Sequence, residues 1–229
     1  MLNFHETTED EFSSYGRHLW LNTDACKSHE QASQTIVQNL YEEFLNEAGE
    51  PLLPLVRIFR STKVADLPPD LKALVNPDEQ QVMALTGTYG VEAKWCDRKQ
   101  SVNHKVIPLS KLAVPQRIPM FQAVLEQLGI DLDHLYNAQE FLTVHGERYK
   151  GTFFIPDVPR EPVIVDKSGF VQPYGIQSLV GFGGFMGQDK SLYLLYAFAG
   201  VPIPDEGAEA FCKIQEFVGA ALAKRQIFS

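Results

Sequence analysis

The chain has few cysteines and a shortage of basic residues, and each of these features excludes a class of protein. Only three of its 229 residues are cysteines, Cys26, Cys96 and Cys212. Their wide, unpaired spacing argues against a disulfide framework or a structural zinc site. Lysine and arginine together number 20 against 29 acidic residues, which gives a formal net charge of -9. We therefore expect no nucleic-acid interface, because neutralising phosphates requires a basic surface.

The sequence also lacks the long hydrophobic segments of secreted or membrane proteins. Its start, MLNFHETTEDEF, is acidic and has no apolar core of the kind found in signal peptides. No uninterrupted apolar run reaches the roughly 18 residues that a membrane-spanning helix needs. Hydrophobic residues make up 45% and charged residues 21% of the chain, as is usual for a globular protein with a sizeable core. These features predict a cytoplasmic protein.

Hydrophobic periodicity predicts one α+β domain over residues 28–229. An acidic N-terminal extension, residues 1–27, precedes this domain. We expect the extension to be partly mobile or to pack on the domain through one short apolar stretch. Ser28 is the expected N-cap of the first helix, with Gln31 three residues on as in a capping box. Residues 131–148 fit no single element. Consecutive strands with short connections favour an antiparallel sheet covered by helices. The predicted elements are helix 28–47, strand 53–61, a short helix after residue 70, strands 80–89 and 106–107, helix 115–128, strands 152–155, 174–184 and 191–199, and helix 204–225.

The apolar hairpin formed by the last two predicted strands is the centre of this arrangement. Tyr174 stands where the first strand is predicted to begin, and Gly181, Gly183 and Gly184 stand near its end. Glycine in a strand marks a bulge, a bend or a close approach to the backbone. One interpretation is a pocket wall near Tyr174 and the glycines. The other is a buried hairpin whose glycines serve only packing and turning.

The densest polar cluster lies in the predicted loop that follows strand 80–89. Tryptophan offers a stacking surface, arginine a planar fork for a carboxylate or phosphate, and histidine an acid–base group or an axial ligand for haem. The alternative is a structural network in which Asp97 caps a turn, Arg98 holds the loop and His104 donates to a carbonyl. The members of the cluster are Trp95, Asp97, Arg98, Ser101 and His104.

Two further stretches stand out, WCDRKQSVNHKVIPL at residues 95–109 and PYGIQSLVGFGG at residues 173–184. Both resemble motifs of GAF-like sensory input domains that stand N-terminal to bacterial histidine kinases and related signalling proteins. The resemblance extends from about residue 36 to residue 222. It implies an antiparallel sheet of five to six strands, with the N- and C-terminal helices on one face and a small-molecule pocket on the other. It also implies sensing. Since no kinase, diguanylate cyclase or DNA-binding segment follows Ser229 in the printed sequence, we expect the output to reside in a separate protein.

The resulting hypothesis is a signal-sensing domain that binds a small molecule and signals to a separate partner, such as a histidine kinase, with a homodimer as a further possibility. No catalytic motif is present, so we expect no enzyme, and the sequence names no cofactor. The alternatives are a haem- or metal-dependent sensor that uses His104, and a protein-binding adaptor without a working pocket. The residues expected to contact the ligand are Trp95, Asp97, Arg98, Ser101, His104, Tyr174 and Ser178.

Overall fold

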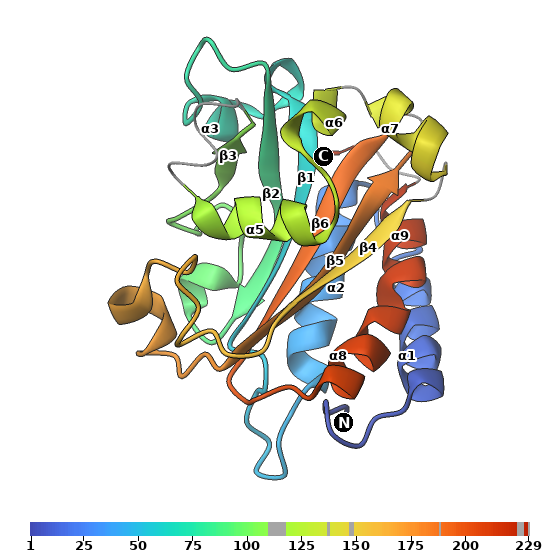
Figure 1. Ribbon diagram of the computed structural model, residues 1–229, viewed down its shortest axis with the longest axis vertical. Coiled ribbons are helices and arrows are strands. Elements are labelled where there is room, and N and C mark those ends of the chain that lie inside the picture. The colour runs from blue at the N-terminus through green and yellow to red at the C-terminus, as the bar shows by residue number, and fades with distance from the viewer. Residues whose placement is uncertain (110–117, 137, 147–148, 188, 224–226, 229) are drawn as a thin grey trace.

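Six strands form one antiparallel sheet in the computed structural model, which describes residues 1–109, 118–136, 138–146, 149–187, 189–223 and 227–228. The strand order is β3-β2-β1-β6-β5-β4 (Figure 1). Helices pack on this sheet, which confirms the predicted α+β class. The strands are β1 (Leu55–Lys63), β2 (Gln81–Gly90), β3 (Val106–Pro108), β4 (Lys150–Ile155), β5 (Ser178–Met186) and β6 (Ser191–Ala199).

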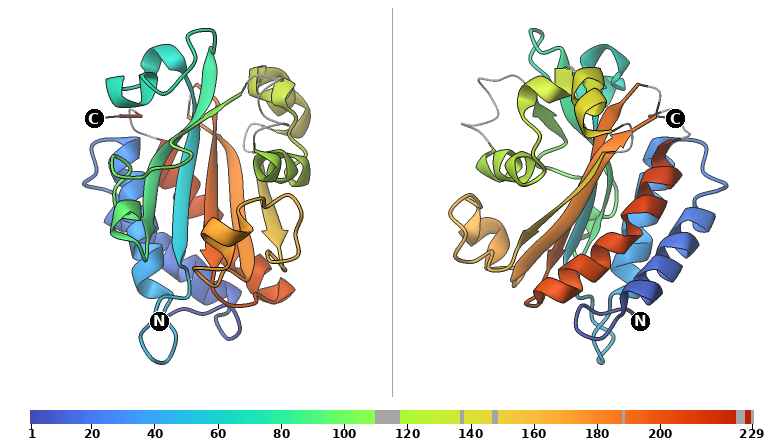
Figure 2. Two further views of the ribbon diagram at one scale, coloured as in Figure 1. Left: turned by 90° about the vertical axis from the view of Figure 1, so that its left-hand side faces the viewer. Right: turned by 45° about the vertical axis from the view of Figure 1, so that its right-hand side comes forward.

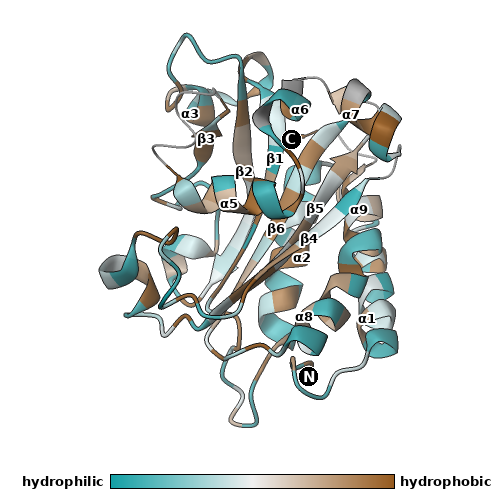
Figure 3. Cartoon of the chain, viewed as in Figure 1, coloured by the Kyte–Doolittle hydropathy of each residue, from teal (hydrophilic) through white to brown (hydrophobic). Residues whose placement is uncertain are grey.

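Helices from both ends of the chain cover one face of the sheet (Figure 2). They are α1 (Glu9–Asn22), α2 (His29–Glu43), α8 (Asp205–Phe211) and α9 (Gln215–Ala223). Because side chains alternate along a strand, Val56 and Ile58 of β1 pack toward these helices. The helices show mixed hydrophilic and hydrophobic colouring, as expected of elements with only one face on the sheet (Figure 3).

Helix α2 begins where the sequence predicts. The Ser28 hydroxyl accepts a hydrogen bond from the Gln31 backbone N–H at 3.1 Å, which supplies a partner for one of the free donors of the first helical turn. The helix ends at Glu43 and not at residue 47, because Leu45 pairs with Pro51 in an isolated bridge. The single helix predicted over residues 204–225 is divided by a 3₁₀ turn, Cys212–Ile214.

The first 27 residues contain a helix that periodicity did not reveal. Thr8 and Glu11 form a capping box at the start of α1. Phe12 and Leu19 on its inner side are buried, as is Phe4 before it. Phe12 stacks on Phe44 with ring centroids 5.9 Å apart. The N-terminal residues therefore contribute to the core on the helical face of the sheet.

Shorter elements cover the opposite face. They include a 3₁₀ turn at Ala93–Trp95, a π-helical turn at Lys167–Val171, and helices α5 (Pro119–Gln127), α6 (Leu132–Tyr136) and α7 (Ala138–His145). The short helix α3 (Pro69–Lys72) instead packs through Leu71 on Val82 and Ala84, on the face that carries α2. Pro119 stands at the first turn of α5, as predicted. Residues 115–117 of the predicted helix lie outside the described residues. No helix in the described part of the chain is long and apolar enough to cross a membrane.

The start of strand β5 is a correction to the sequence interpretation. The strand begins at Ser178 and not at Tyr174, because the preceding residues form turns. The Asp166 carboxylate accepts a hydrogen bond from the Gly169 N–H at 3.0 Å, and Gly175 adopts a left-handed φ of 61°. These turns place Phe170 and Tyr174 over the sheet instead of within it.

The glycines of β5 serve packing. A side chain at Gly181 would collide with the Leu195 carbonyl and the Phe153 ring, and one at Gly183 would collide with the Tyr193 carbonyl. None of these glycines lines the cavity described below. Among the two interpretations of the hairpin, the structure supports close packing for its glycines, whereas Tyr174 does line the cavity.

Candidate ligand-binding site

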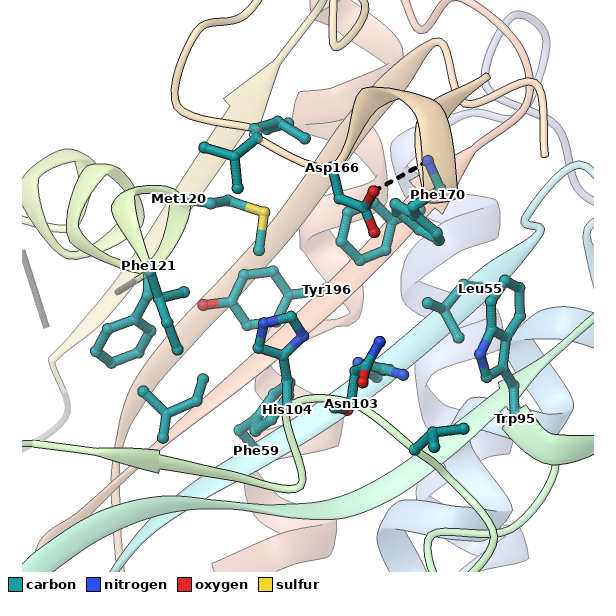
Figure 4. Close-up of a pocket in the computed structure, with 18 of the residues that line it drawn as sticks. Leu55, Phe59, Trp95, Asn103, His104, Met120, Phe121, Asp166, Phe170 and Tyr196 are labelled. Carbon is teal, nitrogen blue, oxygen red and sulfur yellow. Dashed lines mark hydrogen bonds between the residues drawn. The ribbon is translucent and has the colours of Figure 1, made fainter. Parts of the chain in front are cut away.

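A cavity of about 220 Å³ lies on the sheet face opposite α1, α2, α8 and α9. The sheet forms its floor, and α5, the Ala93–Trp95 turn and the segment 163–174 form its walls. Met120, His104 and Tyr196 point into the same space (Figure 4). Most lining side chains are apolar or aromatic, and a few polar groups converge among them, as is typical of small-molecule sites.

Strands β1 and β6 place the side chains of the floor. Alternate residues of β1, namely Leu55, Arg57 and Phe59, line the cavity. In the antiparallel register Leu55 lies opposite Phe198, and Arg57 lies opposite Tyr196. Cross-strand partners share a face of the sheet, so the arginine and the tyrosine are neighbours on the cavity floor.

Arg57 is a buried cation in this apolar setting, with 8% of its surface exposed. Its NH1 donates to the Asn103 carbonyl at 3.4 Å and its NH2 to the Ser101 hydroxyl at 3.3 Å. These hydrogen bonds are long. Its Nε has no hydrogen-bond partner among the described residues. Burial lowers the pKa of Arg57 from 12.5 to about 10, so the guanidinium is still charged at neutral pH.

Tyr196 supplies a second unused polar group. Its side chain is 2% exposed, and its hydroxyl also lacks a hydrogen-bond partner among the described residues. Burial raises the pKa of this phenol, so the hydroxyl keeps its proton and can donate. The ring packs against Phe59 in a T-shaped arrangement and against a tilted Phe153, with centroids 5.7 and 5.1 Å away.

His104 stands at the mouth of the cavity. Its side chain is exposed and its backbone adopts a left-handed φ of 57°, which histidine tolerates better than bulkier residues. Desolvation by the surrounding atoms and the nearby Arg57 lower the pKa of His104, while Asp166 opposes them. The imidazole is therefore neutral at neutral pH and can both donate and accept a hydrogen bond.

Three aromatic side chains form one wall of the cavity. The Trp95 ring lies 4.5 Å from that of Tyr174 and 5.9 Å from that of Phe170, centroid to centroid. The Tyr174 hydroxyl donates to a Glu92 carboxylate oxygen at 3.0 Å, which fixes the ring over the turn that carries Trp95. Desolvation and this hydrogen bond both raise the pKa of Tyr174.

The structure brings together only part of the predicted ligand-contact set. Trp95, His104 and Tyr174 line the cavity. Ser101 is buried beneath it and reaches it through Arg57. Asp97 accepts a hydrogen bond from the Lys99 N–H at 2.8 Å, which is the turn-capping arrangement of the structural alternative.

Arg98 and Ser178 lie elsewhere in the fold and do not line the cavity. Arg98 is paired with Glu30 of α2 and, at 2.8 Å, with Asp70 of α3, and therefore ties the loop to two helices. The Ser178 hydroxyl donates to the Pro156 carbonyl at 2.8 Å and accepts from the Ile203 N–H at 3.1 Å. Both side chains are thus engaged in contacts that hold the fold.

Two cavity residues, Arg57 and Tyr196, were missing from the predicted set. The sequence did contain a signal for Arg57, because an arginine lies within the apolar strand sequence LVRIF. A charged residue in a buried strand is costly and often has a functional or structural role. Tyr196 gave no comparable signal, because aromatic residues are common in buried strands.

Among the described residues, neither a metal centre nor a thiol site lies at the cavity. The described residues include no group of three or more His, Cys, Asp or Glu side chains that could hold a metal ion. No cysteine belongs to the described lining of the cavity. Burial, together with Glu209, raises the pKa of the Cys212 thiol to about 12, which leaves it protonated and unreactive.

Comparison with solved structures identifies the fold. A free methionine-R-sulfoxide reductase from Neisseria meningitidis, solved with its substrate, superposes with a TM-score of 0.51 at 10% identity over 97% of this chain and 95% of that one. The GAF domain of a phosphoenolpyruvate-protein phosphotransferase from Coxiella burnetii gives 0.46 at 15% identity, over 95% and 94% of the two chains. A phycoerythrobilin-bound GAF domain of a cyanobacterial phytochrome gives 0.41 at 13% identity, over 97% and 96%.

The chain has a GAF-like fold, which confirms the fold implied by the resemblance found in the sequence. No family model matches the sequence, and no curated protein matches it either. At these low identities the comparisons establish the fold alone. Such folds carry both sensors and enzymes, so the function has to be argued from the site itself.

Proposed function

We propose that this protein is a sensory domain that binds a small molecule in the cavity between the sheet and α5, and passes the signal to a separate protein. The observation that carries the proposal is the unused hydrogen-bonding capacity of Arg57 Nε and the Tyr196 hydroxyl. Buried polar groups in folded proteins are nearly always paired. A ligand in the cavity would supply the partner that the described chain does not provide.

The cavity walls suit recognition better than catalysis. Trp95 and Tyr174 offer flat aromatic surfaces, and the neutral His104 offers a hydrogen bond at the mouth. No serine, threonine or cysteine of the described lining stands beside His104 to act as a nucleophile. The proposal therefore assigns binding, and no chemical step, to this site.

Strand β1 connects the cavity with the helical face, which suggests a route for the signal. Arg57 and Arg60 point to opposite faces of this strand. Arg60 donates to the Ser191 hydroxyl at 2.8 Å, lies 3.2 Å from the buried His29 ring of α2, and pairs with Asp189 at 2.8 Å. A ligand that shifts β1 would alter this network and with it the position of α2. We expect the output partner to contact the helical face.

Blocking the cavity provides a test of ligand binding. Met120 lines the cavity and is only partly buried, so Met120→Trp should fill the space with little damage to the fold. Val144, 77% exposed and outside the lining, offers the matched control Val144→Trp. The measurement is the thermal shift caused by a library of small metabolites.

We expect at least one compound to raise the Tm of the wild-type protein and of Val144→Trp but not that of Met120→Trp. A library without any such compound, or shifts of equal size in all three proteins, would overturn the proposed site.

A further inference from the structure

We propose that Arg57 and Tyr196 form an anion site on the cavity floor that selects small monocarboxylates with an apolar body. This inference rests on the proposed function and adds the chemical class of the ligand. It follows from three observations: the charge pairing of the buried arginines, the arrangement of unpaired polar atoms across the sheet, and the charge balance of the cavity wall.

The buried arginines of this chain provide an internal comparison. Three arginines are buried among the described residues: Arg57, Arg60 and Arg98. Arg60 pairs with Asp189, and Arg98 pairs with Glu30 and Asp70. No described carboxylate forms an ion pair with Arg57. Since a buried charge is costly without a counter-charge, Arg57 is the one member of the set whose anion is missing from the described residues.

The unpaired polar atoms are concentrated in one row across the sheet. Thr88 of β2, Arg57 of β1 and Tyr196 of β6 lie opposite one another in register and share a face of the sheet, and Arg57 and Tyr196, but not Thr88, line the cavity. The five buried side-chain polar atoms without a partner among the described residues include Thr88 Oγ1, Arg57 Nε and the Tyr196 hydroxyl. Three of these five atoms therefore belong to residues of a single register row. Two of the three residues, Arg57 and Tyr196, are neighbours on the cavity floor, which points to one group missing between them.

The charge of the wall indicates a monoanion. Arg57 is the single buried cation of the described lining, and Lys94 lies exposed at the rim. Asp166 also lines the cavity and would repel a second negative charge. A planar carboxylate can accept hydrogen bonds from the guanidinium Nε and from the phenol. The aromatic and aliphatic side chains around these donors would enclose an apolar body, as Figure 4 shows for Phe121 and Phe170.

Pairs of probes that differ only in having a carboxylate or an amide can separate the contribution of the carboxylate from that of the apolar body. We would titrate acetate, butyrate, hexanoate, benzoate and phenylacetate, and the primary amide of each, into the protein by isothermal calorimetry. The proteins are wild type, Arg57→Gln, Tyr196→Phe and the control Arg160→Gln, which changes an arginine that is 89% exposed. Circular dichroism and thermal melting would establish that each variant is folded.

We expect at least one carboxylate to bind the wild type and Arg160→Gln about tenfold or more tightly than its amide does. Arg57→Gln should bind the acid and the amide equally, and Tyr196→Phe should lose about threefold to tenfold in affinity for the acid. Equal binding of acid and amide by wild type, abolished in Met120→Trp, would overturn the anion site and leave the proposed cavity intact.

Two other results would also overturn the inference. One is competition by inorganic phosphate at the affinity of the best carboxylate, which would indicate a general oxyanion site. The other is the absence of binding by every carboxylate at about 10 mM, the range of the weakest specific affinities. If the metabolite library also gave no thermal shift, the proposed function would fail together with the inference of a carboxylate site.

Discussion

Arg57 and Arg98 are both buried arginines, yet only Arg98 has carboxylate partners among the described residues. Arg98 has two carboxylate partners. Desolvation alone would lower the pKa of Arg98, but its hydrogen bonds and charge contacts with Asp70 and Glu30 outweigh it and raise the pKa. Burial lowers the pKa of Arg57, and no carboxylate among the described residues pairs with it. We therefore expect Arg98 to stabilise the fold and Arg57 to destabilise it when no ligand is bound.

Substitution of each arginine by methionine should have opposite effects on stability. We expect Arg98→Met to lower the free energy of unfolding by about 2 kcal/mol, because two carboxylates lose their partner and both retain some contact with solvent. Arg57→Met should leave it unchanged or raise it by up to about 2 kcal/mol, because a buried uncompensated charge is removed. Urea denaturation of the ligand-free proteins measures both. An equal loss in the two variants would contradict this account of Arg57.

His104 should make the protein sensitive to acid. Its pKa in the folded protein lies below the ordinary histidine value of 6.5, so the unfolded chain binds the proton more readily. The stability that depends on a neutral His104 is present above 6.5 and is lost as the pH falls through the lower folded value. His104→Asn keeps a residue that tolerates the left-handed backbone and removes the titration.

The Tm measured between about pH 7.5 and about pH 5 should therefore fall less in His104→Asn than in the wild type. Parallel curves for the two proteins would show that His104 does not titrate against Arg57 in the folded state.

At the residue scale, Trp95, His104 and Tyr174 of the predicted ligand-contact set line the cavity, whereas the predicted arginine, Arg98, lies outside it. The motif at residues 95–109 drew attention to Arg98, and the pairing of Arg98 depends on Glu30 and Asp70, which are distant in the chain. Which of two arginines lacks an acid is decided by the packing of α2 and α3. No local pattern records that packing.

Helix α1 is the element whose contribution was least visible in the sequence. Most of its outer residues are polar, whereas Phe12 and Leu19 on its inner side are only 0% and 1% exposed. Phe12 lies within 6.0 Å, centroid to centroid, of Phe211 at the end of α8. The two ends of the chain therefore share one core on the helical face.

Truncation of Phe12 should be costly for this reason. We expect Phe12→Ala to lower the free energy of unfolding by about 3 to 4 kcal/mol, through lost burial and a residual cavity. Leu21 on the same helix is 56% exposed, so Leu21→Ala should change stability by no more than about 0.5 kcal/mol. Chemical denaturation measures both. If Phe12→Ala proved as mild as Leu21→Ala, α1 would have no part in the cooperative core.

The success of the sequence interpretation also varied between elements. Strands β1, β2 and β6 and helix α2 have periodic apolar residues with clear boundaries, and the sequence located them within a few residues. The strand predicted over residues 174–184 started too early, because the Asp166 side chain and the left-handed Gly175 impose turns before Ser178. Side-chain to backbone hydrogen bonds of this kind override a hydrophobic pattern, because they offer the backbone an alternative to the sheet.

At the scale of the whole molecule, the sheet separates a binding face from a helical face. The cavity lies on one side, and the helices from both chain ends lie on the other (Figure 2). Under the proposed function, this separation would allow a ligand and a partner protein to be bound at the same time. The sheet would then transmit any change between them.

The same arrangement leaves the outer side of α1 available for self-association, and the homodimer stays a prediction. Trp20 and Leu21 are 40% and 56% exposed there. We expect light scattering to give about twice the chain mass of 25.7 kDa, and we expect Trp20→Glu to reduce the mass toward that of a single chain. A monomer at high protein concentration would exclude the dimer and leave the binding site unaffected.

The central claim is that the cavity holds a small carboxylate on Arg57, and mass spectrometry of the molecules carried by the protein from its native host tests it most directly. Wild type and Val144→Trp should release a carboxylic acid on denaturation, and Arg57→Gln and Met120→Trp should retain about tenfold less of it. A neutral or phosphorylated molecule released in equal amounts by wild type and Arg57→Gln would contradict the claim.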